Sequence, residues 1–467
     1  MSLNRTVKHA VAAAMMALLA ANVAHAQAPE GGADIPKLEY EKYTLDNGLE
    51  VILHQDRSVP LVAVSVWYHV GSGDEVPGRS GFAHLFEHMM FQGSKHTGED
   101  VHFSTLQNIG ASSINGTTNK DRTNYFEVVP SNQLETALWL ESDRMGYMLD
   151  LLTQKSFDNQ RDVVRNERRQ RYDNVPFGKE RFAVAEALYP DDHPYRYLTI
   201  GRHEDLEAAT LDDVRDFFTT WYVPSNATIT IGGDFEVEDA KAAVAKWFGS
   251  FPRIEPPKRV EAPMPKLDKT VRRTINDPLA KLSRVHYVWP SPPYLKARDL
   301  DLDVISTALG ASGWGSLHRK LIIEEQLAQS LSVAQYSSGY SSEFHIIVTT
   351  PPNADLKKIE TIIQAELDRV TSEPLDQEVI ARSVNVMESN YIWRLEALLS
   401  RVEQLQSFNH HTDNPGYLPT YLKERRGRTA QQIMETAKAI LSAPRVEVIT
   451  LPGDTPQKAA PNQGGAQ

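Results

Sequence analysis

The chain has 467 residues, of which 41% are hydrophobic and 24% charged, with no cysteine and a formal net charge of −12 at pH 7. This composition is that of a soluble globular protein and excludes wholesale disorder, while the length favours two or more domains. The negative charge provides no electrostatic reason to bind nucleic acid or an anionic membrane, and the lack of cysteine excludes disulfide bonds and thiolate metal ligands.

The first residues have the three parts of a secretory signal peptide. Arg5 and Lys8 supply positive charge, residues 11–21 are an apolar run, and Ala24–Ala26 is a cleavage site of the small-x-small type. The apolar run is too short to be a membrane anchor. We therefore predict a signal peptide over residues 1–26, cleaved near Ala26, and a soluble protein exported to the periplasm.

Strand patterns begin after a turn-rich leader, residues 27–37. Residues 49–54 and 61–70 are rich in β-branched and aromatic residues, so they are predicted to be neighbouring strands, with an Asn-Gly turn before the first. A Gly-rich loop, residues 71–80, leads into the next segment.

The segment from Gly81 to Gly93 carries the strongest functional signal. If it is helical, apolar side chains fall at the spacing of one buried face. These side chains are Phe82, Leu85, Phe86, Met89 and Met90. The opposite stripe holds His84, Glu87, His88 and Phe91. A surface helix with two histidines would show the same short pattern, but the separation of polar and apolar faces favours a metal site.

The order His-x-x-Glu-His is the inverted form of a zinc peptidase motif, in which the two histidines bind zinc and the glutamate is the general base. A catalytic zinc has three protein ligands and one open position, so a third ligand is required. Spacing alone leaves three glutamates open for this role: Glu141, Glu167 and Glu180.

Strands and helices alternate through the rest of the first half. The predicted strands are residues 111–118, 123–129 and 227–231, and the predicted helices are residues 98–109, 131–151, 156–172, 179–188 and 236–248. Ser131 is the expected N-cap of its helix. The arginines at positions 161, 165, 168, 169 and 171 are interpreted as a solvated helix face.

Prolines concentrated in residues 251–266 predict a semi-rigid linker. Beyond it the order of elements repeats. The predicted strands are residues 270–275, 282–289, 329–335, 342–350 and 446–451. The predicted helices are residues 297–309 and 316–325, and long helical segments are predicted to fill residues 355–409 and 429–441. The helix of residues 297–309 has no histidine, so the second repeat is expected to lack metal ligands.

We predict an α+β fold of two similar repeats, each an antiparallel-rich sheet covered by helices on one face, forming a clam-shell. The expected domains are a zinc-binding repeat over residues 27–250, the linker, a second repeat over residues 267–452 and a disordered tail over residues 453–467.

The chain resembles the inverted zinc metallopeptidases that include pitrilysin, insulin-degrading enzyme and the mitochondrial processing peptidase. The stretches that carry the resemblance are residues 81–93, 115–130, 161–170 and 193–195. In that family the third zinc ligand ends an Arg-Asp-Val-Val-type run, so the resemblance implies Glu167. With one pair of similar halves, the chain is similar to the smaller bacterial members that work as dimers.

Two departures from the family pattern stand out. Gln160 replaces an acidic residue that often supports the site, which is expected to weaken zinc binding or slow the reaction. Relatives also carry an Arg and a Tyr in the second half that hold the substrate, and Ile323 and Gln329 occupy those places here. We infer that a homologous partner subunit supplies the pair; the alternative is local substitution by Arg319, Tyr336 or Tyr340.

The sequence and the resemblance together predict a zinc-dependent endopeptidase with one Zn²⁺ per chain. His84, His88 and Glu167 would bind zinc, Glu87 would be the catalytic base, and small or unfolded peptides would pair with the strand of residues 113–118, where Asn115 orients them. An ordinary turn at Asn115 explains this part of the sequence equally well. The alternatives are a non-catalytic assembly or binding subunit of the same fold and a homodimer instead of a heterodimer.

Overall fold

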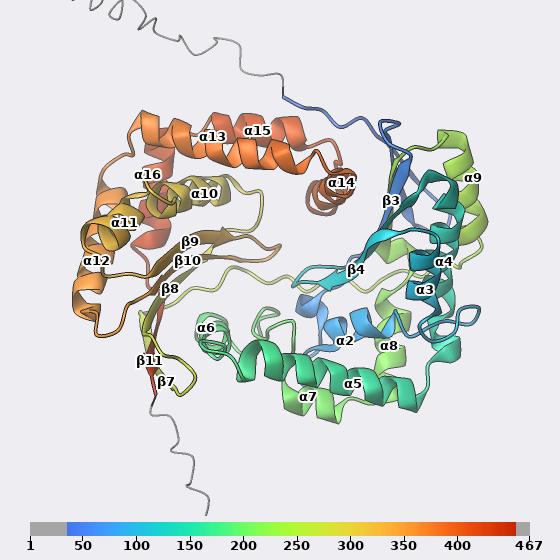
Figure 1. The fold of residues 1–467 in the computed structure, drawn as a ribbon, viewed down its shortest axis with the longest axis horizontal. Helices are drawn as coiled ribbons and strands as arrows, with labels where there is room; N and C mark the ends of the chain where they lie inside the picture. Colours follow the sequence, from blue (N-terminus) through green and yellow to red (C-terminus); the bar gives the residue numbers. More distant parts are fainter. Residues whose placement is uncertain (1–34, 454–467) are drawn as a thin grey trace, which may run out of the picture. The chain divides into compact units, whose positions relative to one another are not determined.

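Two mixed sheets form the framework of residues 35–453, the part of the chain that the computed structural model describes (Figure 1). The predicted signal peptide and the tail after residue 453 lie outside the described residues. The strands of the first sheet are β1 (Glu41–Thr44), β2 (Glu50–Gln55), β3 (Leu61–Tyr68), β4 (Ser112–Thr118), β5 (Thr123–Pro130) and β6 (Ala227–Gly233). Those of the second sheet are β7 (Val271–Asp277), β8 (Arg284–Ser291), β9 (Ser330–Tyr336), β10 (Ser342–Thr349) and β11 (Val446–Pro452).

The two sheets have the same topology apart from β1, an additional edge strand of the first sheet. The first has the order β1-β2-β6-β3-β5-β4 and the second the order β7-β11-β8-β10-β9. In the first, β2 and β6 are parallel, and in the second, β7 and β11 are parallel, while the other paired strands are antiparallel. Without β1, each strand of one sheet has a counterpart at the same place in the other, which confirms two similar α+β repeats.

Helices cover each sheet. Those of the first half are α2 (Phe82–Met89), α3 (Val101–Asn108), α4 (Leu134–Leu151), α5 (Gln154–Arg168), α6 (Glu180–Leu188), α7 (His203–Ala208), α8 (Leu211–Trp221) and α9 (Val237–Phe248). Those of the second half are α10 (Ala297–Gly310), α11 (Ser316–His318), α12 (Leu356–Ser372), α13 (Gln377–Arg394), α14 (Leu398–Thr412), α15 (Leu418–Arg426) and α16 (Ala430–Leu441). None of the described helices is both long and apolar enough to cross a membrane.

Each sheet also receives a helix from the other half of the chain. Helix α14 packs on β3 and β6, and α6 packs on β8 and β11. In β3, Val62, Val64 and Val66 join the main core of the first half, whereas Ala63 packs with Val402 of α14. Because side chains alternate between the faces of a strand, α14 covers the face opposite to that core.

Several element boundaries differ from the sequence-based expectation. Ser131 does not cap α4, because a short 3₁₀ turn (Ser131–Gln133) precedes the helix, and α4 begins after Gln133 without a side-chain cap. Helix α5 begins earlier than predicted, since the Thr153 side chain accepts a hydrogen bond from the Ser156 N–H. It continues as a π-helical segment (Arg169–Asp173). Helices α7, α8 and α15 were not predicted.

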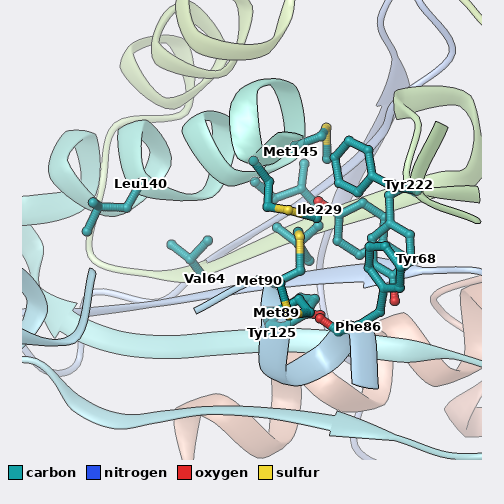
Figure 2. Close-up of a cluster of buried hydrophobic side chains, with 14 of the residues drawn as sticks. Val64, Tyr68, Phe86, Met89, Met90, Tyr125, Leu140, Met145, Tyr222 and Ile229 are labelled. Atoms are coloured by element: carbon teal, nitrogen blue, oxygen red, sulfur yellow. The ribbon is translucent and has the colours of Figure 1, made fainter. Parts of the chain in front are cut away.

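Helix α2 buries the apolar face that its spacing predicts, with each of the five side chains at most 2% exposed. Figure 2 shows Phe86, Met89 and Met90 against Tyr68, Tyr125 and Tyr222. Phe91, placed by the sequence on the polar stripe, lies beyond the end of the helix at Met89. It therefore leaves the helical phase and stacks on Phe103.

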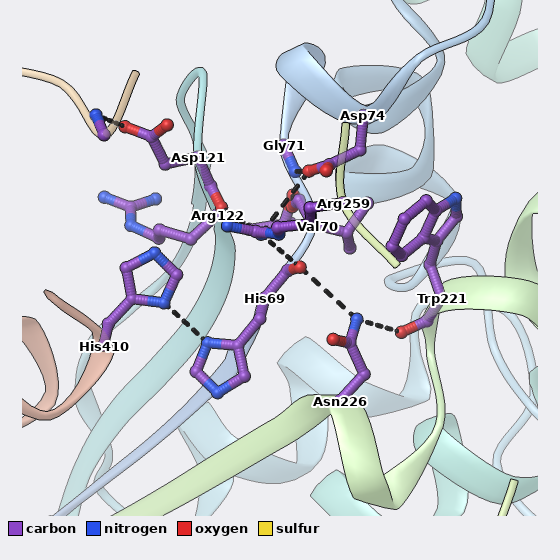
Figure 3. A network of polar contacts seen from close by, with 12 residues as sticks. His69, Val70, Gly71, Asp74, Asp121, Arg122, Trp221, Asn226, Arg259 and His410 are labelled. Carbon is purple, nitrogen blue, oxygen red and sulfur yellow. Dashed lines mark hydrogen bonds and ion pairs between the residues drawn. The ribbon is translucent and has the colours of Figure 1, made fainter. Parts of the chain in front are cut away.

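A polar network joins the linker and α14 to the first half (Figure 3). The Arg259 guanidinium donates to the carbonyl oxygens of His69 and Asp121. The Nδ1 atoms of His69 and His410, on α14, lie 2.7 Å apart. Burial and the charge of Arg259 lower the pKa of His69 to about 4, and burial also lowers the pKa of His410, so this pair is neutral at neutral pH. The linker residue Arg259 is thus bound to the first half.

Candidate metal centre

Three side chains from two helices converge beside the first sheet. His84 and His88 come from α2 and Glu167 from the last turn of α5, which packs against α2. The Oε2 atom of Glu167 lies 3.6 Å from Nε2 of His84 and 3.4 Å from Nε2 of His88. The two imidazole rings are edge to face, with centroids 4.9 Å apart. The geometry thus brings together three of the residues singled out in the sequence.

The spacing of these atoms fits a zinc ion. Two ligand atoms bound at about 2.1 Å to one tetrahedral zinc lie about 3.4 Å apart, close to the separations found here. Burial, together with the neighbouring His88, lowers the pKa of His84 to about 4, so this imidazole is neutral and able to bind a cation at neutral pH. The donor set of two imidazoles and one carboxylate is that of catalytic zinc sites.

The second oxygen of Glu167 is also bound. Nη1 of Arg171, from the π-helical segment, lies 2.7 Å from Oε1. Burial raises the pKa of Glu167, but the hydrogen bond from His88 and the charges of His84 and Arg171 outweigh it, so the pKa lies below its ordinary value. Glu167 is therefore a carboxylate with one oxygen turned to the histidines and the other held by Arg171.

The other two glutamates left open by spacing do not reach the histidines. Glu141 is fully buried, and both of its oxygens accept hydrogen bonds from Arg144. It belongs to a different buried group with His102 and Glu127, in which the Arg144 guanidinium already provides a cation. Glu180 lies against the second sheet, where it accepts a hydrogen bond from the Thr450 hydroxyl.

Glu87 lies between its two histidine neighbours on α2 and the edge strand β4. Its Oε2 atom accepts a 2.6 Å hydrogen bond from the Thr118 hydroxyl. Burial raises the pKa of the Glu87 carboxyl above its ordinary value, while the Thr118 hydrogen bond acts in the opposite direction. A carboxylate with a raised pKa is a stronger base, which suits proton transfer near neutral pH.

The strand β4 is the end strand of the first sheet, so one of its edges is unpaired by the described strands. Asn115 lies on this strand, exposed, opposite Phe126 of β5. Gly116 and Thr118 occupy the alternate positions, which point to the Glu87 side, so Asn115 points to the other face. An additional strand could pair with β4 through main-chain hydrogen bonds.

Sequence reasoning missed a half-buried carboxylate at the start of α2. Glu75 accepts hydrogen bonds from the backbone N–H groups of Gly81, at 3.0 Å, and Ala83, at 2.8 Å. These contacts satisfy N–H groups that the first turn of a helix leaves free. Gly81, with φ 92°, takes the left-handed conformation at this turn. The signal available in the sequence was an acidic residue a few positions before the predicted start of the helix.

Sequence comparisons relate both halves of the chain to one peptidase family. The family model described as insulinase (peptidase family M16) matches residues 50–185, and the model described as peptidase M16 inactive domain matches residues 208–387. The chain is 28% identical over 372 residues to the zinc protease PqqE of Helicobacter pylori, covering 78% of this chain and 81% of that protein. It is 24% identical to the uncharacterized zinc protease YmxG of Bacillus subtilis, covering 78% of this chain and 86% of that protein.

Solved structures share the fold. A protease from Helicobacter pylori superposes with a TM-score of 0.83 at 25% identity, covering 89% of this chain and all of the other. The periplasmic protease PqqL from Escherichia coli superposes with a TM-score of 0.72 at 17% identity, covering 92% of this chain and 50% of the other.

Proposed function

The chain belongs to the M16 family of inverted zinc metallopeptidases, and on that premise we propose that it is a zinc-dependent endopeptidase acting on small or unfolded peptides. The observation that carries the proposal is the convergence of His84, His88 and Glu167 on one point, with the Glu87 carboxylate beside them.

His84, His88 and Glu167 would hold one zinc ion per chain. Bound there, zinc would act as a Lewis acid that lowers the pKa of a water molecule and polarises the scissile carbonyl group. Glu87 takes a proton from the attacking water and passes it to the leaving amine. A peptide paired as an extended strand with β4 would be held mainly through its main chain, with Asn115 as a further contact, so little sequence specificity is expected.

The proposal includes a homologous partner subunit. Ile323, where relatives place an arginine, lies 49% exposed in a π-helical segment (Arg319–Glu324), and Gln329 directly precedes β9. Neither Ile323 nor Gln329 can supply the guanidinium of the arginine or the phenol of the tyrosine in the family pattern. A second chain that carries the Arg/Tyr pair would complete the site; a homodimer would need Arg319, Tyr336 or Tyr340 in their place.

The proposed location is an exported compartment. Its support is the secretory pattern of the first 26 residues, with Arg5, Lys8 and the apolar run of residues 11–21. The first test is to express the protein in a bacterium with a periplasm and measure the mass of the mature chain. We expect the mass of a chain cleaved near Ala26.

The decisive experiment compares wild type with Glu87→Gln. Both are purified with and without the homologous partner and tested for zinc content and fluorogenic peptide cleavage. We expect cleavage that disappears with a chelator and returns with zinc, and a loss of about 100-fold or more in kcat for the variant at unchanged zinc content. Full activity of zinc-loaded Glu87→Gln would exclude this mechanism.

A non-catalytic assembly or binding subunit gives a different result in the same experiment. Wild type would then bind zinc or a partner without cleaving peptide, and Glu87→Gln would change nothing. The intact His-x-x-Glu-His order supports the peptidase, because a binding subunit has no need of Glu87.

A further inference from the structure

The Thr118 hydroxyl makes a short polar contact with the Glu87 carboxylate. The donor comes from the last residue of β4, and the acceptor is Oε2, at 2.6 Å. Resting on the proposed peptidase function, we propose that Thr118 is a positioning residue: it fixes the Glu87 carboxylate and couples its orientation to the strand that would bind the substrate.

The opposite oxygen of Glu87 is left available. Among the described residues, no side chain or backbone group donates a hydrogen bond to Oε1. Because the Thr118 hydroxyl donates its single hydrogen to Oε2, it distinguishes the two oxygens. Oε1 thus keeps its full acceptor capacity, and in this proposal it is the atom that accepts a proton from water.

The backbone of β4 is shaped for this contact. A Cβ atom at Gly116 would lie 3.1 Å from Cγ of Glu87 and equally close to the Tyr125 ring, which is tighter than ordinary contact. Gly116 thus lets the strand pass close to Glu87, and two residues later the side chain on the same face is Thr118. A bulkier residue at 116 would push strand and carboxylate apart.

The neighbouring residues hold Thr118 in register. It pairs with Thr123 of β5, and the intervening turn is fixed because the Asn119 side chain accepts hydrogen bonds from the Asp121 and Arg122 N–H groups, at 2.7 and 2.8 Å. Nη1 of Arg122 in turn donates to the Thr117 carbonyl oxygen at 2.8 Å.

This arrangement links substrate binding to the base. The inner edge of β4 is paired with β5, and its outer edge would take the substrate strand. With a substrate strand bound at the outer edge, β4 is restrained at both edges, and the Thr118 hydroxyl is restrained with it. The carboxylate is then held in one orientation when a peptide is present.

The test uses three variants of the full-length chain, with the partner where it is needed for activity. Thr118→Val keeps the shape and removes the hydroxyl, Thr118→Ser keeps the hydroxyl, and Thr361→Val is the control. The Thr361 hydroxyl is exposed on α12 and donates to the Lys357 carbonyl oxygen, away from the metal centre. The readouts are kcat, KM and zinc content.

We expect Thr118→Val to lower kcat by about 10- to 100-fold, by analogy with the loss found when a group that orients a metal ligand is removed. KM and zinc content should stay close to wild type, Thr118→Ser should recover most of the rate, and Thr361→Val should be unaffected. Equal kcat in wild type and Thr118→Val would overturn the proposal, as would a rate loss that Thr118→Ser fails to rescue.

A second measurement does not depend on activity. The unfolding midpoints of metal-free wild type, Thr118→Val, Glu87→Ala and the double variant form a cycle that isolates the coupling between the two side chains. We expect the two effects to be non-additive, and additive effects would rule the contact out. If wild type binds no zinc and cleaves no peptide, the peptidase proposal fails while this cycle still decides the contact.

Discussion

At the scale of single residues, the two oxygens of Glu167 have different partners. Oε2 faces both histidines and Oε1 lies 2.7 Å from Arg171. Arg171 lies four residues after Glu167, in the π-helical segment that continues α5. Arg171 is thus a charged neighbour that holds the second oxygen of Glu167.

Arg171→Ala should therefore weaken zinc binding. The guanidinium is 71% exposed, so we expect a loss in affinity of about tenfold, at the lower end of the range for groups that orient a metal ligand. Chelator competition measures it. Arg169→Ala is the matched control, because Arg169 is bonded to Asn166. Equal affinities of the two variants would contradict this role.

Among the elements, α14 couples the two halves through one half-buried carboxylate. Glu403 accepts hydrogen bonds from the Ser65 hydroxyl at 2.5 Å, the Trp67 indole at 3.2 Å and the Asn124 amide at 2.9 Å. Close approach needs Gly232, since a Cβ there would lie 2.5 Å from Val402. Asn124 also accepts from Thr117 of β4, so α14 braces the strand next to Glu87.

Glu403→Ala should destabilise the protein, because it leaves three buried donors without an acceptor. We expect the free energy of unfolding to fall by about 2–4 kcal/mol, measured by urea denaturation with tryptophan fluorescence as one probe. Glu403→Gln retains an acceptor oxygen and should cost less. Glu435→Ala, at an exposed position on α16, is the control. If Glu403→Ala lowers the free energy of unfolding no more than this control does, Glu403 does not hold α14 in place.

In the molecule as a whole, the candidate metal centre lies against the large apolar core of the first half. The apolar side of α2 packs into the main core of the first half, and Glu75 binds the start of the helix. Zinc would thus add stability to a protein that is already folded, unlike the metal of a small zinc-dependent domain.

Removal of zinc should leave the far-ultraviolet circular dichroism unchanged and lower the melting temperature. A ligand at 100 times its dissociation constant stabilises the folded state by about 2.7 kcal/mol. Adding zinc to the metal-free protein should raise the melting temperature of wild type and Glu87→Gln but not of Glu167→Gln. Loss of helical signal on chelation would show instead that the metal is required for folding.

Residue spacing within single elements is enough to predict the local features of this protein. The alternation of faces in residues 81–93 sets His84, Glu87 and His88 on one side of α2, because helical spacing is a local property. The strand patterns and their repetition predicted the α+β fold and its two similar repeats. Glu167 was chosen over Glu141 and Glu180 only through the family resemblance, since no local rule relates residues so far apart.

Which distant segments meet depends on the packing of the folded chain. It brings α5 to α2, so that Glu167 lies beside both histidines, and it lays β4 against Glu87, so that Thr118 reaches the carboxylate. It also places α14 and α6 each on the sheet of the other half. These contacts depend on the packing of elements that are far apart in the chain, and residue spacing along one element contains no information about them.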